Sequence, residues 1–210
     1  MGEPAWECLH RNPLLVRHAT FLERDEADAV LATLARDIPW ESPTLTLYGK
    51  THVIPRAQCW MGDPELNYRY SGRTLRPEPW HGAVKTLRDR LTTSLRHSEL
   101  GSLFSDSVWF NSVLLNRYAH GGQRMGWHSD DEPELGPDPI VVSLSLGVER
   151  PLRFRTRRRE GRQAFNVWLP HGSLLVMGPG SQRYWQHALA PRSIDGVRIN
   201  LTFRRITTAS

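Results

Sequence analysis

The sequence predicts a mainly β domain of the α+β class, in which helices pack against a β core. Three observations support this prediction: short alternating runs of apolar and polar residues in the second half, two segments with apolar residues at helical spacing in the first half, and an ordinary globular composition. Of the 210 residues, 39% are hydrophobic and 23% are charged. For this length a single domain over residues 1–210 is the simplest organisation.

Two helices are expected before the β-rich half. Residues 21–36 and 82–96 each carry apolar side chains three or four positions apart, which is typical of an amphipathic helix. The segment between them, 42–80, is rich in Pro, Gly and aromatic residues. It predicts irregular strands and loops, where binding residues tend to lie.

The β core is expected within residues 108–206. Short alternating runs separated by turn residues are typical of an antiparallel sandwich or barrel. The candidate strands cover residues 108–118, 140–147, 152–157, 164–169, 173–177, 184–189 and 198–205.

The positive charge of the chain is almost entirely arginine. Lys and Arg number 27 against 22 acidic residues, and only Lys50 and Lys85 are lysines. The planar guanidinium suits phosphate and carboxylate groups, so the charge is compatible with a nucleic-acid partner. The densest cluster has two interpretations, a solvated hairpin or a phosphate-binding one. It comprises Arg153, Arg155, Arg157, Arg158, Arg159 and Arg162.

Cysteine content and hydropathy favour a cytoplasmic protein without membrane contact. Cys8 and Cys59 are too few for a disulfide framework, and no apolar run approaches the roughly 20 residues that cross a bilayer. We expect a monomer.

A metal site is predicted around His128-Ser129-Asp130. Residues two apart in an extended segment project to the same face, so His128 and Asp130 can point into one cavity. A further histidine would complete two histidines and one carboxylate, the set that holds Fe(II) with open positions for a cosubstrate and O₂. We choose His187, which lies in an alternating strand beside aromatic residues. His171, between Pro170 and Gly172, is interpreted as a turn histidine.

A row of polar residues alternates with apolar ones near the end of the chain. Arg198, Asn200, Thr202 and Arg204 share one face of the predicted strand. A solvated face is the ordinary interpretation of such a row. The alternative is a receptor for a dicarboxylate, although the two arginine backbones would lie ~20 Å apart and their side chains would have to lean inward. Asn116 and Tyr118 form a second same-face pair that can hydrogen-bond a carboxylate.

Five ordered segments resemble the AlkB family of Fe(II)- and 2-oxoglutarate-dependent dioxygenases. They are Asn116-Arg117-Tyr118, residues 127–132, residues 143–147, Trp185-Gln186-His187 and residues 198–204. The resemblance implies a double-stranded β-helix (jelly-roll) core with N-terminal helices and a nucleotide-recognition lid over 42–80. It implies that His128, Asp130 and His187 hold Fe(II). It also implies that 2-oxoglutarate is bound by Asn116, Tyr118, Arg198, Asn200, Thr202 and Arg204, with Arg204 nearer the metal.

The lid segment resembles that of the nucleic-acid dealkylation-repair members. The resemblance implies substrate contacts from Tyr48, Gly49, Lys50, Arg56, Tyr68, Arg69 and Tyr70. By the same analogy, Asp131 would accept a hydrogen bond from the amino group of the damaged base. With a DNA substrate, Arg157, Arg158 and Arg159 are expected to contact the phosphate backbone.

The implied activity is oxidative dealkylation of 1-methyladenine and 3-methylcytosine in DNA. Fe(II), 2-oxoglutarate and O₂ would be required, and formaldehyde, succinate and CO₂ would be released. The alternatives are a 2-oxoglutarate oxygenase acting on RNA or protein, and a catalytically inactive damage-binding module. The compact chain suggests a bacterial-type cytoplasmic enzyme, or a nuclear one if the source is eukaryotic.

Overall fold

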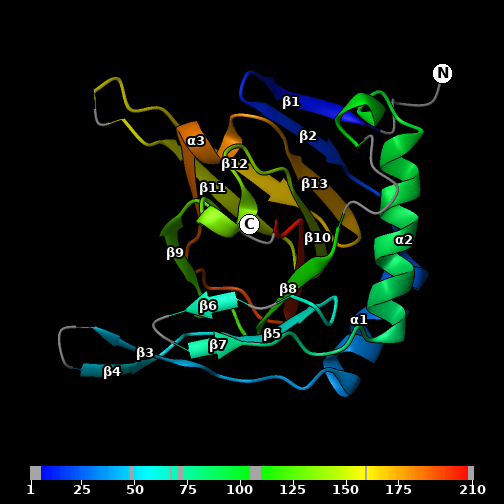
Figure 1. The fold of residues 1–210 in the computed structure, drawn as a ribbon, viewed down its shortest axis with the longest axis vertical. Helices are drawn as coiled ribbons and strands as arrows, with labels where there is room; N and C mark the ends of the chain where they lie inside the picture. Colours follow the sequence, from blue (N-terminus) through cyan, green and yellow to red (C-terminus); the bar gives the residue numbers. More distant parts are fainter. Residues whose placement is uncertain are drawn as a thin grey trace.

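Two antiparallel β sheets lie face to face in the computed structural model, and helices cover the outer side of the larger sheet (Figure 1). The structure describes residues 6–47, 50–66, 68–70, 73–104, 110–158 and 160–207; for 45–47, 50, 68–70 and 73–75 it describes the backbone alone. Within these ranges the larger sheet has seven strands in the order β1-β2-β13-β10-β15-β8-β5, and the smaller has four in the order β12-β11-β14-β9.

The strands of the larger sheet are β1 (Glu7–Arg11), β2 (Leu14–His18), β5 (Ala57–Gly62), β8 (Ser112–Tyr118), β10 (Val141–Gly147), β13 (Ser173–Met177) and β15 (Arg198–Arg204). Those of the smaller sheet are β9 (Met125–His128), β11 (Arg150–Thr156), β12 (Ala164–Leu169) and β14 (Trp185–Leu189). Two hairpins, β3 (Thr44–Leu47) with β4 (Lys50–Val53) and β6 (Tyr68–Tyr70) with β7 (Arg73–Leu75), lie outside both sheets (Figure 1). The helices are α1 (Arg24–Asp37), α2 (Gly82–Arg96) and α3 (Ser181–Tyr184), with 3₁₀ turns at Gly101–Leu103 and Pro133–Leu135.

The apolar face of the larger sheet packs against α1 and α2. On β15, Ile199, Leu201 and Phe203 are fully buried in one cluster with helix residues such as Leu34 and Leu91. Burial of each such side chain stabilises the fold by about 1.5–3 kcal/mol. Because side chains alternate along a strand, the residues between them must face the other sheet. The helix contact therefore fixes which face of β15 lines the interior.

A second cluster fills one end of the space between the sheets. It joins Phe154 and Trp185 of the smaller sheet to Leu175 and Met177 of the larger. This apolar wall leaves the polar face of β15 to line the remaining interior. The site described below lies there.

The structure confirms the predicted fold class and both expected helices. α2 spans the predicted residues, while α1 begins three residues later than predicted and ends one later. Its first turn carries Asp25 and Glu26 and its last turn carries Arg36, which complements the helix dipole.

Several strand boundaries differ from the predictions. Tyr184 belongs to α3 rather than to the following strand. β8 begins at Ser112, and residues 105–109 lie outside the described ranges. β1, β2 and β9 were not predicted, because the runs Glu7–Arg11 and Leu14–His18 do not alternate between apolar and polar residues and Met125–His128 has only four residues. The segment 42–80 contains both hairpins but also β5, which pairs with β8 in the larger sheet. Its extent as a lid stays a prediction.

In the part of the chain that the structure describes, none of the helices combines the length and the apolar character needed to span a bilayer.

The two cysteines are predicted to differ sharply in reactivity. Burial, with the negative charges of Glu78 and Glu41, raises the pKa of Cys59 to about 12, whereas Cys8 is exposed. The thiolate is the reactive form, so iodoacetamide at pH 8 should add one label to the folded protein and two in denaturant. Intact-mass spectrometry counts the labels. Rapid double labelling of the folded chain would contradict the buried position of Cys59.

Candidate active site

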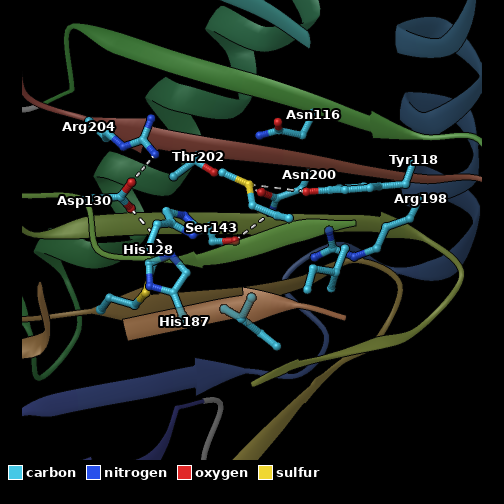
Figure 2. Close-up of a pocket in the computed structure, with 14 residues that line it drawn as sticks. Asn116, Tyr118, His128, Asp130, Ser143, His187, Arg198, Asn200, Thr202 and Arg204 are labelled. Atoms are coloured by element: carbon cyan, nitrogen blue, oxygen red, sulfur yellow. Dashed lines mark hydrogen bonds and ion pairs between the residues drawn. The ribbon is translucent and has the colours of Figure 1, made fainter. Parts of the chain in front are cut away.

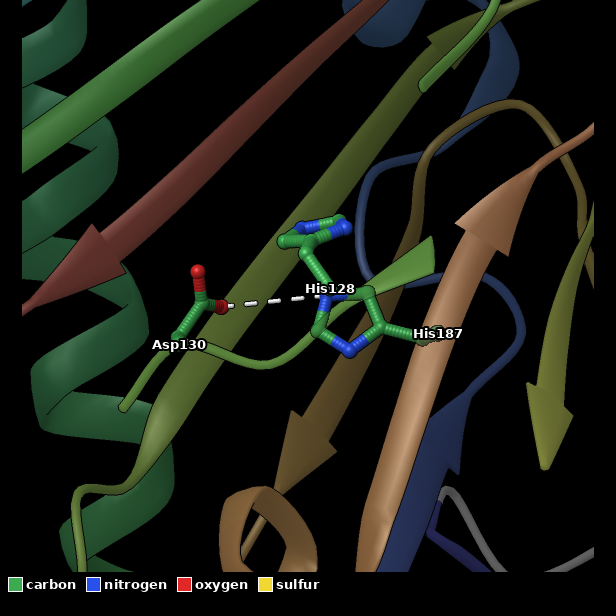
Figure 3. Close-up of side chains that lie close together, drawn as sticks. All are labelled: His128, Asp130 and His187. Atoms are coloured by element: carbon green, nitrogen blue, oxygen red, sulfur yellow. Dashed lines mark ion pairs between the residues drawn. The ribbon is translucent and has the colours of Figure 1, made fainter. Parts of the chain in front are cut away.

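Strand pairing brings together the three residues predicted to bind metal. His128 ends β9 and lies directly opposite His187 on the neighbouring β14. Asp130 follows two residues after His128. One ligand atom from each residue lies within 4.8 Å of the other two (Figure 3). The structure therefore gathers this predicted set in one place, from segments almost 60 residues apart.

Burial and charge prepare this cluster for a cation. The exposed fractions of Asp130 and His187 are 2% and 5%. Burial acts to raise the pKa of Asp130, but the charge of Arg204, with smaller contributions from His187 and His128, outweighs it and holds the pKa below its ordinary value. Burial lowers the pKa of His187 to about 3. The cluster thus combines a carboxylate with a neutral imidazole, the protonation states that metal ligands need.

The hydrogen bonds around the cluster also fit a bound metal. Arg204 Nη2 donates to Asp130 Oδ1 at 2.6 Å. Asp130 Oδ2 is buried without a hydrogen-bond partner among the described residues and lies 3.8 Å from His187 Nε2. The Nδ1–H of His128 donates to the Gly126 carbonyl at 2.9 Å, which leaves Nε2 available as a ligand. Outer contacts of this kind orient ligands in known metal sites.

His171, the other histidine considered, lies elsewhere. Its Nδ1 accepts a hydrogen bond from the Gly147 backbone at 2.8 Å, and its Nε2 lies 3.1 Å from Asp28 Oδ1. Both ring nitrogens are therefore engaged, Nδ1 with the end of β10 and Nε2 with α1.

A cleft runs from the metal cluster between the two sheets. It contains about 450 Å³ free of protein atoms, part of it open to solvent. Figure 2 shows Arg204 with Asp130 and both histidines at one end, and Tyr118 with Arg198 at the other. The lining includes all six residues predicted to bind 2-oxoglutarate: Asn116, Tyr118, Arg198, Asn200, Thr202 and Arg204.

The polar row of β15 is buried, so the solvated-face interpretation is wrong. Arg198, Asn200 and Thr202 are 3%, 9% and 7% exposed. β15 lies between β10 and β8, where Asn200 pairs with both Ser145 and Asn116, and Arg198 pairs with Tyr118. A central strand offers no solvated face when a second sheet covers it.

Two serines of the segment 143–147, for which no site role was predicted, hold this row in place. Arg198 Nη2 donates to Ser145 Oγ at 2.9 Å, and Asn200 Nδ2 donates to Ser143 Oγ at 2.7 Å. Thr202 Oγ1 in turn donates to Asn200 Oδ1 at 2.9 Å. The signal was present in Ser143-Leu144-Ser145-Leu146, because its alternation places both serines on one face.

Arg198 and Tyr118 form the end of the cleft remote from the metal. Burial lowers the pKa of Arg198 to about 10, and burial raises the pKa of Tyr118. The guanidinium carbon of Arg198 lies 5.7 Å from the centre of the Tyr118 ring. A buried cation beside a neutral phenol suits one carboxylate of a small molecule.

The predicted substrate contacts are only partly described. Tyr48 and Gly49, like Arg159, lie outside the described residues. The backbones of Lys50, Tyr68, Arg69 and Tyr70 lie in the two hairpins. The side chain of Arg56 turns toward the cleft, where its Nε donates to Asn116 Oδ1 at 2.8 Å.

Asp131 lies beside the cluster and forms a contact that the sequence did not reveal. Its exposed carboxylate accepts from Arg157 Nη1 at 2.5 Å, and the same nitrogen donates to the Gln182 carbonyl at 3.2 Å. Arg157 was predicted to contact DNA phosphates, whereas here it pairs with the candidate base-reading acid. Arg158 is exposed.

Comparisons with known proteins agree with this geometry. The chain matches the 2OG-Fe(II) oxygenase superfamily over residues 15–204. The chain belongs to this superfamily. Its cofactors are therefore Fe(II) and 2-oxoglutarate, and the prediction of an Fe(II)- and 2-oxoglutarate-dependent dioxygenase is confirmed.

The relatives of this oxygenase are of the AlkB type. It is 33% identical to DNA oxidative demethylase ALKBH2 of Mus musculus, over 98% of this chain and 86% of the mouse protein. It is 36% identical to alpha-ketoglutarate-dependent dioxygenase alkB homolog 3 of Homo sapiens, over 89% of this chain and 64% of that protein. The solved structure of OsALKBH1 matches with a TM-score of 0.59 at 19% identity, covering 95% of this chain and all of that one, and supports the fold.

If His187 is the third metal ligand, alanine variants of His187 and His171 should differ in their affinity for Mn(II). His187→Ala should weaken Mn(II) binding by at least about tenfold, because it removes one of three ligands. His171→Ala, the matched control, should leave Mn(II) affinity unchanged. Electron paramagnetic resonance of free Mn(II) measures both. The reverse pattern would exclude His187 as a ligand.

Proposed function

We propose that this oxygenase repairs DNA by oxidative removal of alkyl groups from bases such as 1-methyladenine and 3-methylcytosine. One observation carries the proposal. The His128–Asp130–His187 cluster and the cleft that ends at Arg198 occur together in this chain, which is similar over nearly its whole length to a DNA oxidative demethylase.

We assign the metal to His128, Asp130 and His187. Bound Fe(II), with 2-oxoglutarate and O₂, supplies oxidation of the N-methyl carbon, which leaves as formaldehyde while 2-oxoglutarate becomes succinate and CO₂. Arg204 keeps Asp130 ionised and oriented through its 2.6 Å hydrogen bond. Burial keeps His187 neutral, so its lone pair is available at physiological pH.

We assign 2-oxoglutarate to the cleft lined by β15 and β8. Arg198 and Tyr118 lie at the end remote from the metal, which suits the distal carboxylate (Figure 2). The hydrogen-bonded row of Asn200 and Thr202 keeps the intervening wall rigid. The protein contributes placement, while the cofactors contribute the reactivity.

Asp131 is assigned to the substrate base. A methyl group on the Watson–Crick edge cannot be reached inside a duplex, so the base must be flipped out. The methylated ring is positively charged, and an acid beside the metal cluster favours it over a neutral base. Arg157 occupies Asp131 Oδ2, so we assign Oδ1 as acceptor for the amino group of the base.

DNA is the proposed substrate, rather than RNA or protein. The name of the mouse relative, a DNA oxidative demethylase, and the arginine-rich composition support this choice. A catalytically inactive module is disfavoured, because the metal cluster and both cleft arginines are present.

Demethylation is tested by mass spectrometry of oligonucleotides. DNA carrying 1-methyladenine or 3-methylcytosine, incubated with protein, Fe(II) and 2-oxoglutarate, should lose the mass of one CH₂ group per lesion. His128→Ala should give no change. Matched RNA oligonucleotides distinguish the RNA alternative. Tight binding of damaged DNA without any mass change would instead identify an inactive damage-binding module.

Arginine contacts with the DNA backbone are tested by salt dependence. Neutralising Arg157, Arg158 and Arg159 together should weaken binding to all sequences alike and reduce the slope of log K against log salt by about 0.9 per lost duplex phosphate contact. Arg24→Gln is the control, since its side chain on α1 is 89% exposed. Fluorescence anisotropy at several salt concentrations gives the slopes. An unchanged slope would show that these arginines do not contact DNA phosphates.

A further inference from the structure

Arg150 is a buried cation that the proposed site does not use. It begins β11 and is 1% exposed. Its Nη2 donates to the carbonyls of Gln123 and Ala190, at 2.9 and 2.6 Å. Its Nε and Nη1 are buried and have no hydrogen-bond partner in the described part of the chain, where no acidic side chain forms an ion pair with it either.

Arg150 lies against the tyrosine at the distal end of the cleft. Its guanidinium carbon is 5.4 Å from the centre of the Tyr118 ring, and that of Arg198 is 5.7 Å from the same ring. Arg198 Nε is likewise buried without a partner within the described ranges. Two buried guanidinium groups therefore contact one aromatic ring, and no carboxylate of the described residues pairs with either.

Such an arrangement is costly unless an anion joins it. A buried charge loses its hydration, and two like charges near each other add repulsion. Burial lowers the pKa of Arg150, and burial, together with the charge of Arg150, lowers that of Arg198. A carboxylate beside Tyr118 would offset both the lost hydration of these charges and the repulsion between them.

We propose that Arg150 belongs to the subsite for the distal carboxylate of 2-oxoglutarate, as a positioning residue that holds Tyr118 and adds positive charge behind it. The inference rests on the cleft assigned above to 2-oxoglutarate. Arg198 contacts the carboxylate, while Arg150 acts through the tyrosine.

The two carbonyls that accept hydrogen bonds from Arg150 lie next to the strands that carry His128 and His187. Gln123 lies just before β9, which carries His128, and Ala190 lies just after β14, which carries His187. These two hydrogen bonds are equally consistent with a purely structural role for Arg150. The test must therefore separate recognition of the distal carboxylate from general support of the fold.

The test compares two ligands that differ only at the distal end. 2-Oxopentanoate keeps the 2-oxo acid and the five-carbon chain of 2-oxoglutarate but ends in a methyl group. Their dissociation constants are measured on Mn(II)-loaded protein by tryptophan fluorescence, without turnover. Arg150→Met should reduce the preference for 2-oxoglutarate over 2-oxopentanoate by about tenfold, because it removes a buried charge near the carboxylate.

Three further variants complete the design. Arg150→Lys keeps the charge and should keep the preference within about threefold of the unmodified protein. Arg150→Gln removes the charge but keeps a donor for the carbonyls. It should reduce the preference as Arg150→Met does, and it takes the place of Arg150→Met if the methionine variant does not fold. Arg153→Met, at an exposed position of the same strand, should change neither dissociation constant.

The outcomes separate the inference from the site on which it rests. Equal weakening of both ligands in Arg150→Met and Arg150→Gln, or no weakening, would overturn the role of Arg150 and leave a structural clamp. A preference lost as completely in Arg150→Lys would also contradict it. Arg198→Met should abolish the preference; if it does not, the assignment of the cleft itself fails.

Discussion

Everything in the site depends on β15 being a central strand with two unlike faces. Its apolar residues pack against the helices, β8 and β10 pair with both of its edges, and the smaller sheet covers its other face. Its polar residues must therefore be buried, and buried polar groups need partners. They find them in Ser143, Ser145 and Asp130.

The central position of β15 also fixes the separation between the two ends of the cleft. Arg204 and Arg198 are six residues apart on one strand, with backbones separated by about 20 Å. Arg204 leans to Asp130, and Arg198 leans to Ser145 and Tyr118. The metal end and the distal end are thus built on the same rigid element, which favours precise placement of a small dicarboxylate between them.

Much of this arrangement could be predicted because it follows local rules. Alternation identified β15, spacing identified α2, and two-residue periodicity placed His128 and Asp130 on one face. The choice of His187 over His171 agrees with the sheet register, in which His187 lies opposite His128. Ser143 and Ser145 follow the same rule, but no site role was predicted for them, because serine carries no strong chemical signal.

The features that escaped prediction depend on contacts between distant segments. The pair Arg157–Asp131 joins residues 26 positions apart, and nothing in either local sequence distinguishes an ion pair from a phosphate contact. Arg150 begins a strand in an arginine-rich region, and it is buried among residues distant in sequence, including Tyr118, Gln123 and Ala190.

In the proposed site Fe(II) and 2-oxoglutarate occupy one continuous cleft. Titration of 2-oxoglutarate into the Fe(II)-loaded protein without oxygen, followed by the visible spectrum, tests this arrangement. Chelation by the 2-oxo acid should produce a weak charge-transfer band that saturates at one equivalent. Binding of both ligands without that band would mean that they occupy separate places, which would contradict the shared cleft.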